Sequence, residues 1–507
     1  MGEHIPEVNV PDIYEKLETL IRCQLTEEKS VGEVLTAFGT PIVSVGIIDN
    51  GDLTATILGS PKPRRGTTVL DFEEPLDTNT LFQAASISKA ITALAVIKLC
   101  QESKLDLDAP ISQYLNREQI SWISTPTTQA MVSQISLRLL LSHTAGLRVS
   151  GFQGYSTSDI PTLPQILRGD SAANNEQIAL FSLPGLRFSY SGGGYTLIQL
   201  ILETHLQKPF PEIIKEAVLG PLKMSRSFYG AIPEKEKNYA PAYLTGKNQA
   251  DPDHHTYPEL PAAALWTTPS DLLKAVHAVQ RSLDSDDFLQ RKWAEVMLTQ
   301  RNNDNDSGMA LGWRTIHKTN SFDHSGSNPP GYKCLAAGYA ALPQRETKQE
   351  DENGNKTENM YSIPKGCGIC VMTSSDLGFR VVQMVVLAIS YFKGWPSLVS
   401  GLAVPFLDRS RTIDGQAKHW CGDWGPGEWC LVEEDEGGIS VRYGSLPAVP
   451  LIPGVIPPHK YDEGNSIDLV ADGLELMLRL GWKEGSRMIE VWHDGPPGAV
   501  INLERKP

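Results

Sequence analysis

The sequence predicts a protein of the α/β class, of the α+β type, in which an antiparallel sheet is flanked by helices, beside an all-helical region, and is followed by a small antiparallel β-barrel. Three observations predict this fold. An almost uniformly apolar helix follows residue 86, strand signals recur through the first 400 residues, and helical periodicity disappears after about residue 408. We therefore place one domain at residues 1–405 and a second at residues 406–507.

The composition is typical of a soluble globular protein. The 507 residues carry a net charge of −15, with 41% hydrophobic and 21% charged residues, and this acidic balance argues against nucleic acid or an anionic membrane as the main partner. The N-terminus has neither the basic nor the apolar region of a secretory signal. The longest apolar run, Val381–Phe392, is too short to span a bilayer. We expect a cytoplasmic protein with no membrane partner.

Seven cysteines are spread along the chain, and their odd number and spacing predict reduced thiols. Cys367 and Cys370 have the spacing of a redox or zinc motif, but they fall inside a predicted buried strand. Residues three apart in a strand point to opposite faces, so we predict two core cysteines. A pair between Cys421 and Cys430 is a minor alternative.

The N-terminal part predicts a helix and a hairpin. Residues 11–38 carry apolar side chains at helical spacing and predict an amphipathic helix together with the segment that follows it. Residues 41–48 and 53–58 predict two strands joined by the turn signal Asp49–Asp52, and a polar loop at 59–77 leads to the next helix.

The stretch from Ser86 to Leu99 predicts a buried helix whose first turn is polar. Residues 87–99 are apolar nearly all round, yet Ser86 and Lys89 stand three residues apart and therefore share one face. Because an ammonium buried without a partner is costly, we expect the amine to act as a base beside the hydroxyl. The helix N-terminus also offers free N–H groups to a developing oxyanion. The alternative is a serine near the N-cap followed by a solvent-facing lysine.

Residues 136–147 predict a short helix that is stopped by a glycine. His143 stands near its end and invites a catalytic interpretation. A histidine in such a position more often hydrogen-bonds the loop that follows the helix, so we predict a structural role for it.

Residues 183–202 contain the second informative motif. A Pro-Gly turn precedes Tyr190, three glycines follow it, and a helix is predicted from about Tyr195. Glycines let the backbone approach a neighbour closely, and a tyrosine held there can share a proton network with the serine and the lysine. The alternative is a turn tyrosine that packs on the sheet. Tyr155 is a rival, but it lacks the turn before it and the helix after it, so we favour Tyr190.

Residues 322–342 predict a strand, a turn and a second strand. The first strand carries His324-Ser-Gly326, which can lay its backbone beside a substrate with His324 as a polar or cationic contact.

Thr268 is predicted to be the N-cap of another helix, with Asp271 at its third position. Further elements are a charged polar insertion at 344–358, a strand at 368–373 and an apolar helix at 378–392.

The C-terminal hundred residues predict short strands that are separated by turns. Several antiparallel strands in such a short stretch indicate a small barrel. The predicted strands lie at residues 422–433, 438–443, 466–470, 474–480, 488–493 and 499–503.

These motifs together resemble the serine β-lactamase and penicillin-binding-protein superfamily, over roughly residues 12–400. Within this superfamily, the chain is most similar to class C β-lactamases, family VIII esterases and D-aminopeptidases. Its C-terminal part resembles the lipocalin-like modules that some members append. The resemblance implies a β-lactamase/transpeptidase-like fold. Three motifs carry it, in the family's order: Ser86-Ile-Ser-Lys89, Tyr190-Ser-Gly192 and His324-Ser-Gly326.

The resemblance implies a mechanism that agrees with the residues. Ser86 would be the acylated nucleophile, and Lys89 with Tyr190 would move its proton, either of them being the base. The backbone N–H groups of Ser86 and Ser327 would form the oxyanion hole. His324 would orient the substrate. No metal or cofactor is implied, and the expected partner is a small-molecule acyl substrate.

Two departures from the family's pattern bear on the substrate. Gly192 stands where relatives carry the Asn that holds the acyl amide of β-lactams, and His324 stands where they carry the Lys that pairs with the carboxylate. Both departures fit an esterase, a D-peptidase or an acyltransferase better than an efficient β-lactamase.

Three functions compete at this point. The first is a serine hydrolase that cleaves an ester, lactone or amide through an acyl-enzyme. The second is an acyltransferase or macrocyclising thioesterase of secondary metabolism with the same acyl-enzyme. The third is a non-catalytic ligand-binding relative, which is disfavoured because Ser86, Lys89 and Tyr190 are all present. The sequence does not indicate an oligomeric state.

Overall fold

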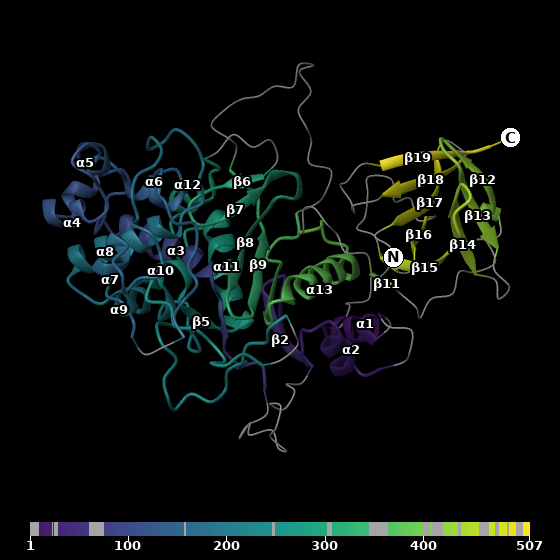
Figure 1. The fold of residues 1–507 in the computed structure, drawn as a ribbon, viewed down its shortest axis with the longest axis horizontal. Coiled ribbons are helices and arrows are strands. Elements are labelled where there is room, and N and C mark those ends of the chain that lie inside the picture. The colour runs from purple at the N-terminus through teal and green to yellow at the C-terminus, as the bar shows by residue number, and fades with distance from the viewer. Residues whose placement is uncertain are drawn as a thin grey trace, which may run out of the picture. The chain divides into compact units, whose positions relative to one another are not determined.

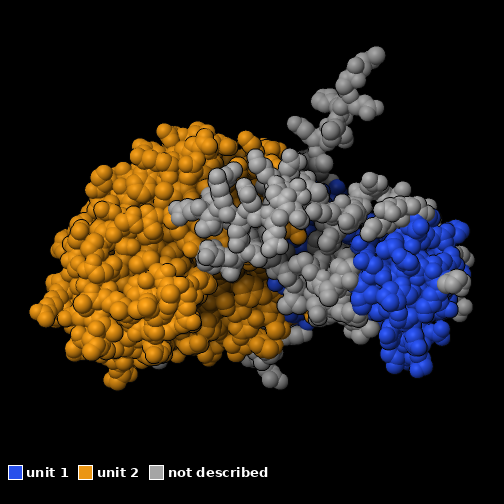
Figure 2. Space-filling view, turned by 90° about the horizontal axis from the view of Figure 1, so that it is seen from above, with its two compact units in different colours: residues 1–38, 383–507 blue, residues 39–382 orange. Residues whose placement is uncertain are grey.

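The structure is a computed structural model, and contacts within it divide the chain into two compact units. Unit 2 comprises residues 39–382, and unit 1 comprises residues 1–38 together with 383–507 (Figure 2). The predicted domain boundary near residue 405 stays a prediction. The described residues are 10–22, 24, 29–59, 76–156, 159–245, 249–301, 307–343, 363–398, 406–407, 419–433, 438–455, 466–471, 476–483, 486–492 and 500–506.

Unit 2 is built on an antiparallel sheet with the order β2-β1-β10-β9-β8-β7-β6, which confirms the predicted class. The predicted hairpin is present, and Asn50 and Gly51 at its turn both have positive φ, which such a tight turn requires. The strands are β1 (Ile42–Asp49), β2 (Asp52–Gly59), β6 (Ser307–Met309), β7 (Arg314–Ile316), β8 (Ser321–Asn328), β9 (Tyr332–Tyr339) and β10 (Gly368–Ser374).

A second, small sheet lies beside the segment that leads to Ser86. Its order is β3-β5-β4, and all of its pairings are antiparallel. The strands are β3 (Phe82–Gln83), β4 (Phe228–Tyr229) and β5 (Leu265–Thr267).

Helices flank the main sheet, and a group from α4 to α9 gathers at one end of unit 2 (Figure 1). The long helices are α3 (Ile87–Gln101), α8 (Gly192–Leu206), α11 (Pro269–Asp284), α12 (Arg291–Leu298) and α13 (Gly378–Lys393). The short ones are η1 (Ile111–Gln113), α4 (Arg117–Ser121), α5 (Gln129–Val132), α6 (Leu137–Leu141), α7 (Leu163–Arg168), α9 (Phe210–Ile214), η2 (Lys215–Leu219), α10 (Leu260–Ala263) and η3 (His317–Thr319).

Helix α11 lies directly on the sheet because glycines leave room for it. A Cβ on Gly46 would lie 2.9 Å from Leu273, and a Cβ on Gly338 would lie 2.5 Å from Val276. The predicted cap is present, since the Thr268 side chain accepts a hydrogen bond from the Asp271 N–H. Helix α3 is buried on every side except at Lys98 and at its last residue, as its apolar pattern predicts.

Unit 1 contains the predicted barrel, which is closed by eight antiparallel strands. Strand β15 pairs with both β14 and β16 and closes it, while β11 adds to β15. The strands are β11 (Phe406–Leu407), β12 (Gly422–Gly425), β13 (Trp429–Glu433), β14 (Ile439–Tyr443), β15 (Val449–Val455), β16 (Ile467–Ala471), β17 (Met477–Lys483), β18 (Ser486–Trp492) and β19 (Val500–Arg505).

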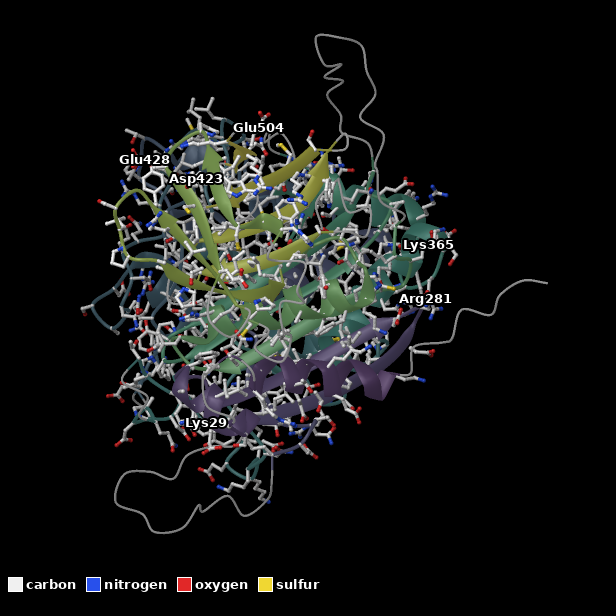
Figure 3. The ribbon with its side chains drawn as sticks, turned by 90° about the vertical axis from the view of Figure 1, so that its right-hand side faces the viewer. Lys29, Arg281, Lys365, Asp423, Glu428 and Glu504 are labelled. Atoms are coloured by element: carbon white, nitrogen blue, oxygen red, sulfur yellow. The ribbon has the colours of Figure 1, made fainter. Side chains whose placement is uncertain are left out.

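The barrel strands alternate between core and surface. Trp424 and Leu503 are buried in its core, whereas their neighbours Asp423 and Glu504 are exposed (Figure 3). The predicted strand at 422–433 is two strands, because the chain turns at residues 426–428.

The N-terminal prediction of one helix is also corrected. Residues 11–38 form α1 (Val10–Arg22) and α2 (Val31–Ala37), and Ser30 and Glu33 make a capping box at the start of α2. Among the described helices, none is long and apolar enough to cross a membrane. Most of the predicted loop at 59–77 and all of the insertion at 344–358 lie outside the described residues.

Candidate active site

Ser86 stands at the N-terminal end of α3, where the chain turns sharply. The preceding Ala85 has a φ of 47°, in the left-handed region, and Ser86 returns to helical backbone angles. The Ala84 N–H donates to the carbonyl of Leu265 in β5 at 2.8 Å, and this bond attaches the segment before Ser86 to the small sheet. The hydroxyl is therefore presented, half-buried, at the positive end of a buried helix.

Lys89 lies one helical turn further on and is 2% exposed. Its Nζ donates to Ser86 Oγ at 3.0 Å and to the Ala262 carbonyl in α10 at 2.8 Å. The carbonyl fixes the amine, and the amine can receive the proton of the hydroxyl. Ala262 is 173 residues away in the chain, and no pattern near Lys89 identifies it.

Strand β8 lies against the segment that precedes Ser86. A Cβ on Gly326 would be 2.3 Å from the carbonyl oxygen of Ala84, so only glycine permits this approach. The Cys334 thiol donates to the same carbonyl at 3.2 Å. Asn328 Nδ2 donates to Gln83 Oε1 at 2.7 Å and to a carbonyl of α10. These contacts hold β8, α10 and α3 together around the hydroxyl.

Tyr190 reaches the same point from the start of α8. Its ring centroid lies 5.1 Å from Lys89 Nζ and 6.4 Å from the His324 ring. Tyr155, the rival, instead accepts a hydrogen bond from the N–H of Asn174. The geometry therefore places Tyr190 beside the amine.

His143 contacts the Tyr190 segment at three points. Its ring is stacked on Tyr190 with the centroids 4.2 Å apart, its Nδ1 accepts from the Ser191 N–H at 3.0 Å, and its carbonyl accepts from the Ser189 N–H at 2.8 Å. Burial, and then the charge of Lys89, hold the pKa of His143 well below its ordinary value. The predicted role in hydrogen bonding is present, but it is directed to the segment that carries Tyr190.

Replacing His143 is therefore expected to act through Tyr190. Asn tolerates the φ of 57° at this position but lacks the ring, so His143→Asn should lower kcat by about 10- to 100-fold, with little change in KM, because Tyr190 loses its stacking partner. Ester turnover measures both constants. His205→Asn, at the far end of α8, is the control. A tenfold rise in KM at unchanged kcat would contradict this role.

The three glycines after Tyr190 form the first turn of α8, three residues earlier than predicted. The Ser191 hydroxyl caps this turn by accepting from the Gly194 N–H at 2.9 Å. A Cβ on Gly193 would lie 2.7 Å from the carbonyl of Arg148, and one on Gly192 would lie 3.0 Å from Phe152. Close packing against residues 148–152 thus explains the glycines.

His324 is buried on β8 and faces the Tyr190 side of the site. Its Nδ1 lies 2.6 Å from the Ser325 carbonyl, to which it must donate, so the neutral ring carries its proton on Nδ1. Burial, the largest cause, lowers the pKa of His324 to about 3. Nε2 has no partner among the described residues and offers a lone pair. Contact of His324 with a substrate stays a prediction, and a neutral ring at this position would make it a polar contact.

Ser327 lies on the exposed side of β8. Its hydroxyl accepts a hydrogen bond from Lys333 Nζ at 2.8 Å, which links β8 to β9 at this point. The pairing of β7 with β8 ends at Asp323, so no β7 partner accompanies residues 324–328. Residues 324–328 of β8 therefore pair with β9 but not with β7.

Comparisons with known proteins show the family of the chain. A family model described as Beta-lactamase matches residues 31–351, which is more than half of the chain. The chain belongs to the β-lactamase family. The match contains Ser86, Lys89, Tyr190 and His324. Within the described ranges, no group of three or more His, Cys, Asp and Glu side chains is placed to hold a metal ion.

Curated relatives in this family are distant. Protein flp from Staphylococcus aureus (strain N315) is 24% identical over 256 residues, which cover 49% of this chain and 48% of that protein. Penicillin-binding protein 4* from Bacillus subtilis (strain 168) is 25% identical over 308 residues, which cover 55% of this chain and 63% of the relative. The chain therefore spans only about half to three-fifths of these relatives.

Solved structures show the same fold. An octameric penicillin-binding protein homologue from Pyrococcus abyssi has a TM-score of 0.54 and 19% identity, covering 98% of this chain and 100% of its own. D-amino acid amidase from Ochrobactrum anthropi SV3, complexed with L-phenylalanine, has a TM-score of 0.53 and 18% identity, covering 75% of this chain and 99% of its own. At these identities the likeness concerns the fold alone.

The neutral state of His324 has a consequence for stability in acid. Between pH 6.5 and about 3 the unfolded chain binds a proton at this ring that the folded chain does not bind, so acidification favours unfolding. Removing the ring removes this linkage. The loss of unfolding free energy from pH 7 to pH 5 should be smaller in His324→Asn than in wild type by about 1–2 kcal/mol. Urea titration measures it, and equal losses would contradict a neutral His324.

Proposed function

We propose that this β-lactamase-family protein is a serine hydrolase that cleaves an ester, lactone or amide through an acyl-enzyme on Ser86. One observation carries the proposal. The buried Lys89 amine lies 3.0 Å from Ser86 Oγ and is fixed by the Ala262 carbonyl, so a base and a nucleophile are already in contact.

Acylation begins when Ser86 Oγ attacks the carbonyl carbon and its proton passes to Lys89. We assign the relay of this proton to the leaving group to Tyr190, whose ring centroid lies 5.1 Å from Lys89 Nζ. The backbone N–H groups of Ser86 and Ser327 are assigned to the oxyanion, where each such donor typically contributes about 3 kcal/mol to transition-state stabilisation. Water then attacks the ester on Ser86, and the same groups return the proton.

The pocket chemistry favours a substrate without the carboxylate of β-lactams. Neutral His324 offers a lone pair through Nε2, which suits an N–H or O–H donor and supplies no positive charge. Gly192 brings no side-chain amide to the acyl group. The fold shared with a D-amino acid amidase makes amides reasonable members of the test set.

Turnover of a substrate panel tests the proposal. Wild type and Ser86→Ala are compared on p-nitrophenyl acetate, nitrocefin, a D-amino-acid amide and an acyl thioester. We expect wild type to hydrolyse the ester or the amide at least about 10³-fold faster than Ser86→Ala, and to prefer both over nitrocefin. Equal rates for the two proteins would contradict the assignment.

An added amine or alcohol separates hydrolysis from transfer. If the acyl group passes to hydroxylamine while free acid does not form without it, the acyltransferase is the better description. If neither acid nor transfer product forms with any substrate, the non-catalytic relative is favoured.

A further inference from the structure

An eight-residue turn next to the candidate active site carries exposed apolar side chains. In residues 181–188, which we call the apolar turn, Phe181 is 40% exposed, Leu183 54%, Leu186 67% and Phe188 37%. The described residues contain eleven exposed large apolar side chains, and four of them lie in this turn. Single exposed apolar residues are ordinary, but clusters of this kind mark binding surfaces.

The turn is rigidly built. The Phe181 N–H donates to the Gly146 carbonyl at 2.9 Å, and the Gly185 N–H donates to the Thr144 carbonyl at 2.7 Å. A Cβ on Gly146 would lie 2.3 Å from the carbonyl oxygen of Ser182, so the two backbones are in direct contact. The fold therefore presents these side chains to solvent in a fixed arrangement.

The apolar turn is continuous with the catalytic residues. The Phe188 and His143 rings form a T-shaped contact with centroids 6.0 Å apart, and the His143 ring is also stacked on Tyr190. Phe188 is only two positions before Tyr190 in the chain. The apolar turn is therefore joined to Tyr190 through the rings of Phe188 and His143.

Two arginines lie over the Phe181 ring of the apolar turn. The guanidinium groups of Arg148 and Arg187 lie 5.9 and 5.4 Å from the Phe181 ring centroid. Leu183 and Leu186 are the most exposed side chains of the apolar turn, at 54% and 67%.

We propose that the apolar turn binds an extended apolar chain on the acyl group while the acyl carbonyl reacts at Ser86. The inference rests on the proposed function and names its substrate class. We commit to an acyl chain as the occupant because the turn is joined to the Tyr190 ring through Phe188 and His143. The acyl group also stays on Ser86 through both half-reactions, so its binding energy serves acylation and deacylation.

A chain-length series of p-nitrophenyl esters tests the proposal, from acetate to octanoate and below micelle-forming concentrations. A half-covered methylene raises kcat/KM about twofold, so wild type should gain roughly 30- to 100-fold across six methylenes.

The variant Leu183→Ser/Leu186→Ser changes exposed side chains only and should fold normally. We expect it to retain the acetate activity and to gain less than fivefold from acetate to octanoate. Leu446→Ser, 62% exposed in the barrel unit, is the matched control and should behave as wild type.

Several outcomes would overturn the proposal. These are an equal chain-length gain in wild type and the double variant, a dependence on the alcohol chain instead of the acyl chain, or a dimer or vesicle binding that the double variant abolishes. Failure of the proposed function is distinct from these, because acetate hydrolysis and its dependence on Ser86 would then be absent from wild type itself.

Discussion

Lys89→Met is expected to lower the rate of Ser86 acylation by about 10³-fold or more. Methionine has similar length but no proton acceptor, so Ser86 Oγ loses the group that lies 3.0 Å away and receives its proton. The Ala262 carbonyl also loses its donor. Single-turnover release of p-nitrophenol from an acetate ester measures the acylation step directly.

Lys98→Met provides the control on the same helix. Lys98 donates to the Phe288 carbonyl and pairs with Glu102, away from the contacts that surround Ser86. Its loss should leave acylation within about twofold of wild type, because surface changes of this kind shift stability by only a few tenths of a kcal/mol. An acylation rate in Lys89→Met within tenfold of wild type would require another base, of which Tyr190 is the nearest candidate.

Gly326→Ala is the second substitution with a large expected effect. The added Cβ would lie 2.3 Å from the Ala84 carbonyl oxygen and 2.6 Å from Cys334 Sγ, so β8 must move away from the segment before Ser86. We expect kcat/KM to fall at least about 100-fold, because a displacement near 1 Å at reacting groups has such a cost, and the unfolding free energy to fall by about 1–3 kcal/mol.

Gly151→Ala is the matched control, because nothing lies within 4 Å of the position of its Cβ. It should keep both the activity and the stability of wild type. Ester turnover and urea unfolding of wild type, Gly326→Ala and Gly151→Ala separate the effect on activity from the effect on stability. If Gly326→Ala keeps full activity, β8 does not need to lie against Ala84 for catalysis.

The local patterns predicted the parts of the fold that local interactions determine. The hairpin turn at Asn50 and Gly51 requires positive φ at both residues, and the buried helix after Ser86 follows from its uniform apolarity. Strand β15 was not predicted, because Pro450 and Pro453 lie inside it and proline lacks the N–H that strands normally use. It still pairs on both sides and closes the barrel.

In the candidate site, too, local motifs predicted some residues, while the contacts that depend on distant parts of the chain were not predicted. Short motifs singled out Ser86, Lys89, Tyr190 and His324, which the structure brings close together, but the groups that orient them are distant in the chain. The Ala262 carbonyl that holds Lys89 is a backbone atom, and its side chain gives no signal. His143 was singled out for its place at a helix end, whereas its stacking on Tyr190 depends on tertiary packing.

The most direct test of the central claim is to locate the acyl-enzyme. Wild type, Lys89→Met and Ser86→Ala are treated with a fluorophosphonate, and intact mass spectrometry with peptide mapping follows. We expect one adduct on wild type, placed on Ser86, a much slower adduct on Lys89→Met and none on Ser86→Ala. An adduct of equal rate on Ser86→Ala, or one mapped to another serine of wild type, would contradict it.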